Sequence, residues 1–230
     1  MGDGGAFCHD LRRRKGNGGA RATVPSASLR LPRPNPYAST STSSSTSHYL
    51  APMILHPWHE VAHRFDAAAA TVDALIEIPR GSKAKYEVDK PSGLIRLDRV
   101  VFAAFQYPSN YGFIPQTLGE DGDPLDILVL SEVSMVPLTL VKTRIIGYME
   151  MIDNGDCDEK VIAVAEGDMS VSHIRDMELL PENFRSELKH FFMNYKTLSN
   201  KVVTVDEFKS TAEATALVQQ CIERYQSKFA

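Results

Sequence analysis

The sequence predicts an α+β protein in which a β-barrel comes first and C-terminal helices pack on it afterwards. Two observations predict this class. From residue 73 to residue 165, short apolar runs alternate with turn residues at a spacing that leaves no helical pattern between them, which is typical of a barrel or a sandwich. Helical periodicity begins only after Pro181, over residues 182–197, and a second helical stretch begins at Ser210.

The strands follow from apolar runs that end at turn residues. The run at 73–78 ends before Pro79. The runs at 84–88 and 94–98 flank a Lys-Pro-Ser-Gly turn at 90–93, as the two strands of a hairpin would. The remaining strand patterns lie at 100–105, 126–130, 139–149 and 160–165.

Two helices are expected near the C-terminus. Over residues 182–197 the apolar side chains fall on one helical face, and Pro181 stands where a first helical turn tolerates proline. A second helix begins at Ser210, which can form a capping box with Glu213. Cys221 falls on the apolar face of this helix, so we expect it to be a small core residue.

Charge is divided unevenly along the chain. Residues 1–59 hold seven basic and two acidic side chains, whereas residues 60–230 hold 18 basic and 27 acidic ones, a net charge of −9. An acidic body argues against nucleic acid as a partner, because phosphate backbones need a basic surface. No apolar run approaches the roughly 20 residues of a membrane helix, so no membrane partner is expected. The sequence is compatible with a homo-oligomer as well as with a monomer.

Residues 1–55 are expected to be a disordered, Ser- and Arg-rich extension, and residues 56–230 a single domain. Glycine, proline, serine and threonine dominate the extension, which therefore buries too little apolar surface to offset its ordering entropy. A segment rich in Arg and Ser and poor in acids also matches an organelle transit peptide. The expected location is the cytoplasm, with a plastid or another organelle as the alternative.

The strongest chemical signal is an acidic run at the start of a buried strand. Asp121, Asp123 and Asp126 lie within six residues, and Gly122 and Pro124 force a bend between them. Clustered carboxylates repel one another unless cations intervene, and oxygen ligands without Cys or His suit Mg²⁺, Mn²⁺ or Ca²⁺. An EF-hand is excluded, since that loop needs glycine where Asp126 stands.

A second acidic loop, at 153–160, can supply further ligands, although either loop alone also matches a solvated turn. Opposite charge comes from basic and phenolic residues, namely Lys83, Lys85, Arg99, Tyr107, Tyr111, Lys160, Tyr195 and Lys196. Taken singly, each lysine is more simply a surface residue. Basic groups that share a face with acidic groups and metal ions suit a phosphate compound.

His59 and His63 lack the third ligand that a zinc site needs.

In combination these motifs resemble the soluble family I inorganic pyrophosphatases, and the His-Pro-Trp-His run at 56–59 resembles the plant members. The segment 121–126 (DGDPLD) matches the family signature D-x-D-P-x-D followed by an apolar strand. Further motifs stand in the family's order at 76–79, 85–87, 98–99, 107–112, 153–160 and 190–196. Pro137-Leu138 departs from the Pro-Gly that is common in the family.

This resemblance implies an OB-like five-stranded β-barrel with flanking C-terminal helices. It implies several Mg²⁺ ions, with Mn²⁺ as a substitute, and hydrolysis of pyrophosphate to two phosphates by in-line attack of a metal-activated water. The implied metal ligands are Asp121, Asp126 and Asp158, with Asp153, Glu87 and Glu77 contributing directly or through water. The implied phosphate-binding residues are Lys85, Arg99, Tyr111, Lys160, Tyr195 and Lys196. Asp123 would be the catalytic base, and Tyr107 a supporting or proton-donating group.

Two other functions stay open on the sequence alone. An OB-like barrel without catalysis could bind an anion or a single-stranded nucleic acid, although an acidic body with one Trp lacks the basic, aromatic groove for it. A broader phosphohydrolase would act on nucleotides as well as on pyrophosphate. These hypotheses are distinguished by measuring phosphate release from pyrophosphate and from ATP under Mg²⁺ and under Mn²⁺. A binding module releases none, and a broader phosphohydrolase releases phosphate from both substrates.

Overall fold

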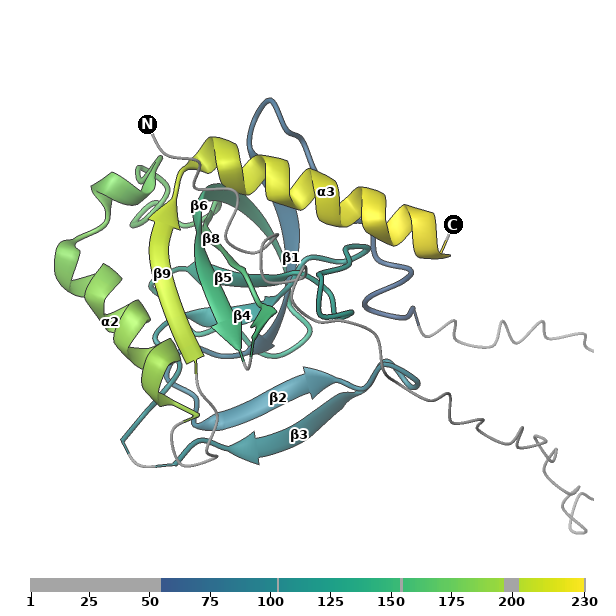
Figure 1. Ribbon diagram of the computed structural model, residues 1–230, viewed down its shortest axis with the longest axis horizontal. Helices are drawn as coiled ribbons and strands as arrows, with labels where there is room; N and C mark the ends of the chain where they lie inside the picture. Colours follow the sequence, from purple (N-terminus) through teal and green to yellow (C-terminus); the bar gives the residue numbers. More distant parts are fainter. Residues whose placement is uncertain (1–54, 103, 154, 197–202, 230) are drawn as a thin grey trace, which may run out of the picture. The chain divides into compact units, whose positions relative to one another are not determined.

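The molecule is built around five strands that close into a ring. They pair in the order β1 (Thr71–Ile78), β4 (Asn110–Phe113), β5 (Asp126–Leu130), β8 (Lys160–Ala165) and β6 (Leu140–Asp153), and β6 pairs back with β1 (Figure 1). Within the ring only β5 and β8 run parallel. The predicted five-stranded barrel is therefore confirmed.

The computed structural model describes residues 55–102, 104–153, 155–196 and 203–229. These residues belong to one compact unit, Leu55–Ala230. The predicted extension lies outside the described residues except for Leu55, so its disorder and its targeting role stay predictions. In the part of the chain that the structure describes, no helix is long and apolar enough to cross a membrane.

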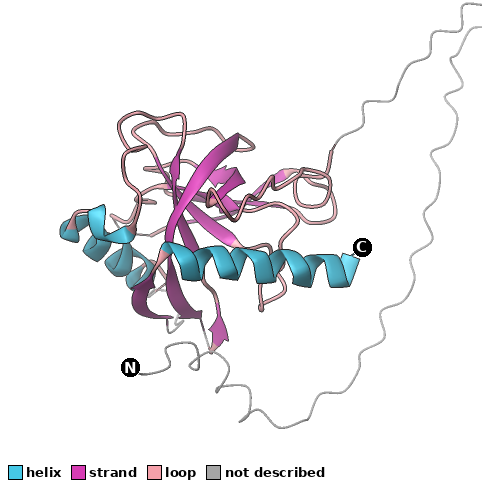
Figure 2. Ribbon diagram, turned by 90° about the horizontal axis from the view of Figure 1, so that it is seen from above, coloured by secondary structure: helices cyan, strands magenta, loops and turns pink. Residues whose placement is uncertain are grey.

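Alternation along the strands sorts their side chains into two apolar clusters. On β5, Leu128 and Leu130 join a cluster that includes helix α2 (Glu182–Asn194), whereas Ile127 and Val129 join a cluster that includes helix α3 (Thr211–Phe229). Because both faces of the strand are covered, four consecutive apolar residues are buried. Figure 2 shows the two helices lying beside the strands.

The two helices confirm the sequence prediction with small differences at their ends. Pro181 is the residue that caps α2, one position before the first helical turn. At the start of α3, the Ser210 amide donates to Glu213 Oε2 at 2.9 Å, and the Glu213 amide donates to Ser210 Oγ at 3.3 Å. This reciprocal pair is the expected capping box. Cys221 is 1% exposed, as predicted for a core residue.

The predicted hairpin forms a separate two-stranded sheet below the barrel in Figure 1, made of β2 (Ala84–Val88) and β3 (Ile95–Val100). The Asp89 carbonyl accepts hydrogen bonds from the amides of Ser92 and Gly93 and so closes the turn. Gly93 has a φ of +69°, in the left-handed region that glycine adopts without a steric penalty.

The prediction of a strand at 100–105 is wrong. The strand β3 ends at Val100, and the described residues beyond it, which exclude residue 103, form a loop. The Val101 amide still donates to the Lys83 carbonyl at 2.7 Å, but Phe102 is 65% exposed. An apolar run is therefore not a buried strand here, because no neighbouring strand continues beside it.

Sequence reasoning also missed three strands and a short 3₁₀ helix: β4, β7 (Asp156–Cys157), β9 (Val203–Lys209) and η2 (Met177–Leu179). The β4 sequence, Asn-Tyr-Gly-Phe, has the composition of a turn. It is a strand because Gly112 lets β1 approach closely. A Cβ atom at residue 112 would lie 1.8 Å from the Leu75 carbonyl oxygen.

Candidate active site

A cavity of about 560 Å³ lies between the β2–β3 hairpin and the adjoining end of the barrel. It gathers every predicted catalytic, metal-binding and phosphate-binding residue except Tyr107, and Lys83 of the predicted basic cluster does not line it either. Eight carboxylates line it: Glu77, Glu87, Asp89, Asp121, Asp123, Asp126, Asp153 and Asp158. Five cationic side chains line it as well, Lys85, Lys90, Arg99, Lys160 and Lys196, together with Tyr111 and Tyr195. The site therefore brings both signs of charge into one space.

The acidic loop before β5 is held in shape by its own backbone. The Gly119 amide donates to the Asp123 carbonyl at 2.7 Å, and the Asp123 amide donates to Asp121 Oδ1 at 3.0 Å. Gly122, at the tip, has a φ of +92°, which favours glycine there. The loop leads directly into β5, whose first residue is Asp126.

Lys160 lies at the centre of the site. It pairs in register with Asp126 at the start of the parallel strands β8 and β5. Its ammonium donates to carboxylate oxygens of Asp126 and Asp158, and the Tyr111 hydroxyl donates to Asp126. The side chain of Lys160 is buried, and burial would lower its pKa, but the two carboxylates outweigh burial and raise the pKa. The lysine therefore carries its charge inside the protein.

Asp153 and Lys196 form a second ion pair, at the end of α2. Lys196 Nζ lies 2.6 Å from Asp153 Oδ2. The other carboxylate oxygen, Asp153 Oδ1, is buried and has no hydrogen-bond partner. A buried, unpartnered carboxylate oxygen facing a cavity is a ready ligand for a cation.

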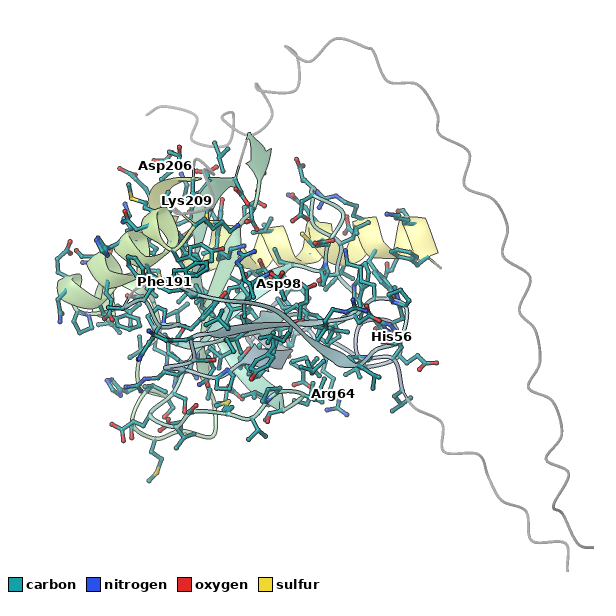
Figure 3. All side chains as sticks on the ribbon, turned by 90° about the horizontal axis from the view of Figure 1, so that it is seen from below. His56, Arg64, Asp98, Phe191, Asp206 and Lys209 are labelled. Atoms are coloured by element: carbon teal, nitrogen blue, oxygen red, sulfur yellow. The ribbon has the colours of Figure 1, made fainter. Side chains whose placement is uncertain are left out.

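The hairpin contributes a network of alternating charge. Lys85 Nζ lies 2.8 Å from Asp98 and 3.2 Å from Glu87, and Arg99 lies 3.1 Å from Asp98. Asp98, which is labelled in Figure 3, is thus shared by two cations. It keeps both pointing along one face of the hairpin.

Glu77 ties the hairpin to the barrel. Its Oε1 accepts a hydrogen bond of 2.6 Å from the Val88 amide. Burial raises the pKa of Glu77 to about 8, because a buried carboxylate without a full counter-charge favours its neutral form. Glu77 therefore holds the hairpin against the barrel as well as lining the cavity.

The pKa values of the other carboxylates show that the site has less positive charge than its carboxylates need. Burial raises the pKa of Asp121 to about 6, and burial also raises the pKa of Asp126. Burial acts on Asp158 in the same direction, but Lys160 and the other nearby lysines overcome it and lower that pKa. A crowd of carboxylates with raised proton affinity is stabilised by added cations.

The donor set fits hard divalent cations. Its oxygen atoms suit Mg²⁺ or Mn²⁺, and Asp153 Oδ1 is available. As the side chains stand in the described residues, no three of the His, Cys, Asp and Glu side chains converge on one point. The Lys160 ammonium instead lies between Asp126 and Asp158, so that cation binding requires small side-chain rotations around it.

Tyr107 lies behind the site and does not line the cavity. It is 2% exposed, and its ring lies 5.5 Å from that of Tyr111 and 6.4 Å from that of Tyr195. Phe191 of α2, labelled in Figure 3, packs on it at 5.0 Å. Tyr107 therefore supports the two tyrosines that do line the cavity.

Sequence reasoning missed Lys90, Asp89 and the role of Trp58. Lys90 forms an ion pair with Asp123, and its ammonium lies 5.9 Å from the Trp58 ring. In the sequence Lys90 is part of a predicted turn, and its role becomes visible only through its pairing across the cavity. The three histidines near Trp58 form hydrogen bonds within the scaffold. His59 Nδ1 lies 2.7 Å from the Tyr225 hydroxyl, His56 Nε2 lies 2.7 Å from the Lys90 carbonyl oxygen, and the Phe65 amide donates to His63 Nδ1 at 2.9 Å.

Known proteins share both the sequence and the fold. The family model described as inorganic pyrophosphatase matches residues 74–226. A soluble inorganic pyrophosphatase of Oryza sativa subsp. indica is 45% identical over 170 residues, which cover 74% of this chain and 79% of the rice protein. Soluble inorganic pyrophosphatase 2 of Chlamydomonas reinhardtii is 44% identical over 174 residues, covering 76% and 90%.

Solved structures agree. The inorganic pyrophosphatase of Thermus thermophilus superposes with a TM-score of 0.68 at 44% identity, covering 70% of this chain and 95% of that protein. The enzyme of Helicobacter pylori gives the same TM-score at 42% identity, covering 73% and 98%. The sequence motifs, the five-stranded barrel and these matches lead to one assignment: the chain belongs to the inorganic pyrophosphatase family.

Proposed function

We propose that this protein hydrolyses inorganic pyrophosphate to two phosphates with the help of Mg²⁺, for which Mn²⁺ can substitute. The observation that carries the proposal is the lining of the cavity, in which eight carboxylates and five cationic side chains face one space. The cationic side chains balance the negative charge of a polyphosphate. The carboxylates bind metal ions, which can coordinate phosphate oxygens at the same time.

The cationic and phenolic side chains bind and orient the substrate. Lys85 and Arg99 project from the hairpin, and Lys160 and Lys196 face them from β8 and the end of α2. Pyrophosphate entering the cavity draws these ammonium groups away from their carboxylates. Burial raises the pKa of Tyr111, so that its phenol stays protonated and donates to a phosphate oxygen. Tyr195 lies beside Lys196 in the lining of the cavity, and its hydroxyl is a second donor for a phosphate oxygen.

The carboxylates hold the divalent cations. Asp121, Asp126 and Asp158 are the main ligands, with Asp153, Glu87 and Glu77 contributing directly or through water. When bound, the cations lower the pKa of a water molecule and neutralise charge on the phosphates. Asp153 Oδ1, which is buried without a hydrogen-bond partner, supports this assignment.

Asp123 acts as the general base. Its carboxylate stands at the mouth of the cavity, 55% exposed, where a water molecule has access to it. The backbone bond from its amide to Asp121 fixes its direction relative to the cation ligands. A carboxylate oxygen of Asp123 takes the proton from the attacking water, and no covalent intermediate with the protein is required. Tyr107 keeps Tyr111 and Tyr195 in place.

The proposal is tested by phosphate release from pyrophosphate under Mg²⁺ by the wild type and by Asp123→Asn. A general base contributes about 10²–10⁴-fold, so the variant should lose at least a hundredfold in kcat. Asp206→Asn is the matched control, because Asp206 is exposed on β9, outside the cavity (Figure 3). A wild-type rate in Asp123→Asn would refute its role. The same assay with ATP decides how strictly pyrophosphate is preferred.

We further propose that residues 1–55 are an extension separate from the catalytic domain at 56–230. Their composition supports this division, as does the start of the compact unit at Leu55. Mass spectrometry of the native N-terminus tests whether the extension is a transit peptide. An N-terminus near residue 50 supports an organelle, whereas an intact Met1 supports the cytoplasm.

A further inference from the structure

Helix α3 supplies none of the predicted site residues, yet it is bonded to the segment that leads into the acidic loop. The Leu118 amide donates to the Cys221 carbonyl at 2.9 Å, and Arg224 donates to the Leu118 carbonyl at 2.7 Å. Both backbone groups of one residue are therefore bound to the helix. Leu118 itself is 4% exposed and packs in the same cluster as Tyr225 of α3.

The residue before Leu118 is fixed independently. The Trp58 indole donates to the Thr117 carbonyl at 2.9 Å, and the Leu125 amide donates to Thr117 Oγ1 at 2.9 Å. These bonds close the base of the loop. The tip, by contrast, is held by bonds within the loop itself, so its position depends on how the Leu118–Gly119 segment is anchored.

Arg224 reaches both sides of Gly119. One nitrogen binds the Leu118 carbonyl, and the other lies 3.5 Å from the Glu120 carboxylate. Its side chain is 33% exposed and that of Glu120 is 21% exposed, so the contact is partly shielded from water. A planar guanidinium presents its donors in a rigid fork and so holds two acceptors in one fixed arrangement, whereas the ammonium of a lysine sits on a flexible stem.

The space inside the loop leaves little freedom. A Cβ atom at Gly119 would lie 2.8 Å from Asp121 Oδ1. The Gly119 backbone therefore packs closely against the Asp121 carboxylate. The Gly119 amide also donates to the Asp123 carbonyl, and the Asp123 amide donates to Asp121 Oδ1, so the three residues form one bonded unit.

We propose that Arg224 is a positioning residue that sets the place of the acidic loop for cation binding. It acts through Leu118 and Glu120 and touches neither substrate nor cation. The phosphate-binding lysines stand on β2, β8 and the end of α2 and make no bond to Arg224, so their geometry does not depend on it. This inference rests on the proposed function, because it requires the loop to bind divalent cations.

Loss of Arg224 should weaken cation binding more than substrate binding. Residues that orient the ligands of a metal typically contribute about 10–100-fold to its affinity. We expect Arg224→Met to raise the Mg²⁺ dissociation constant about tenfold. At saturating Mg²⁺, the KM for pyrophosphate should change by less than about twofold. Arg224→Lys keeps one donor for the Leu118 carbonyl and should recover part of the Mg²⁺ affinity.

The experiment is isothermal titration of Mg²⁺ into the full-length protein without substrate, with melting temperatures in parallel. Two controls separate positioning from general loosening of the helix. Lys228→Met removes the same charge from the same helix, at an exposed residue with no bond to the loop. Val218→Ala weakens the packing of α3 at a fully buried residue.

The inference predicts that only the Arg224 variants shift the Mg²⁺ dissociation constant, even where Val218→Ala lowers the melting temperature as much. Wild-type Mg²⁺ affinity in Arg224→Met would overturn it, as would an equal shift in Val218→Ala. If Arg224→Met does not fold, Arg224→Lys and Glu120→Gln carry the same comparison with smaller shifts. Absence of Mg²⁺ binding by the wild type would overturn the proposed function together with this inference.

Discussion

Replacing Lys160 with methionine is the most direct test of the charge balance in the site. Methionine nearly conserves the volume and removes the ammonium that lies between Asp126 and Asp158. Lys160 is 1% exposed, so water cannot take its place without rearrangement. Two partly buried carboxylates are then left side by side without the ammonium that lies between them.

The expected cost follows from burial. Removing one partner of a buried ion pair destabilises a protein by about 3–5 kcal/mol. The carboxylates keep some exposure, 25% for Asp126 and 16% for Asp158, and Tyr111 still donates to Asp126. We therefore expect a cost at the lower end, about 3 kcal/mol. For a domain of this size that corresponds to a fall in melting temperature of about 6–12 °C.

The sign of the pH dependence is fixed as well. Burial raises the pKa of Asp126 in the folded state, and loss of the ammonium raises it further. A carboxyl with a raised folded pKa binds more protons when folded than when unfolded, so stability increases as the pH falls through that pKa. The deficit of Lys160→Met relative to the wild type should therefore be smaller at pH 5.5 than at pH 8.

The assay is thermal unfolding followed by circular dichroism in EDTA at both pH values. Lys142→Met is the matched control, because Lys142 pairs with Glu166 at 2.8 Å but is 67% exposed. Such a surface pair contributes at most about 1 kcal/mol. If Lys160→Met melts within about 2 °C of the wild type, or shows the same deficit at the two pH values, the Lys160 ammonium does not balance these carboxylates.

Three further outcomes follow from the same structure. Burial raises the pKa of Asp121 to about 6, so protons compete with Mg²⁺ for this carboxylate below that pH. Calorimetry should therefore show weaker Mg²⁺ binding at pH 5.5 than at pH 7.5, and equal Mg²⁺ affinities would contradict this prediction. Ser210→Ala removes the capping bond to Glu213 and should cost about 1 kcal/mol, seen as a lower melting temperature; an unchanged one would mean that the cap contributes nothing. Leu138 has a φ of +68°, a conformation that costs a non-glycine residue about 1–2 kcal/mol. Leu138→Gly should therefore slightly raise the urea concentration at the unfolding midpoint. A lower midpoint would show that packing of the Leu138 side chain outweighs the backbone strain.

The elements that sequence alone predicts are those whose cause is local. The bounds of β5 were predicted as observed, because Pro124 ends the loop and four apolar residues follow Asp126. The hairpin was predicted from its Lys-Pro-Ser-Gly turn, and α3 from its capping box. The acidic loop was found for the same reason, since its residues are neighbours in the chain.

The features that sequence reasoning missed depend on contacts between distant segments. β4 is a strand because β1 and β5 pair with it, and the described residues just after Val100 are not one because no strand pairs with them. The bond from Arg224 to Leu118 joins residues 106 positions apart. The pairing of Lys90 with Asp123 likewise requires the hairpin to face the barrel, which no local pattern specifies.

We propose that this cavity hydrolyses pyrophosphate with divalent cations held by its carboxylates. The most direct measurement is phosphate release from pyrophosphate by the purified protein, first with Mg²⁺ and then with an excess of EDTA. We predict release with Mg²⁺, its loss in EDTA and its return when Mg²⁺ is restored. No release with Mg²⁺, or equal release in EDTA, would contradict the account.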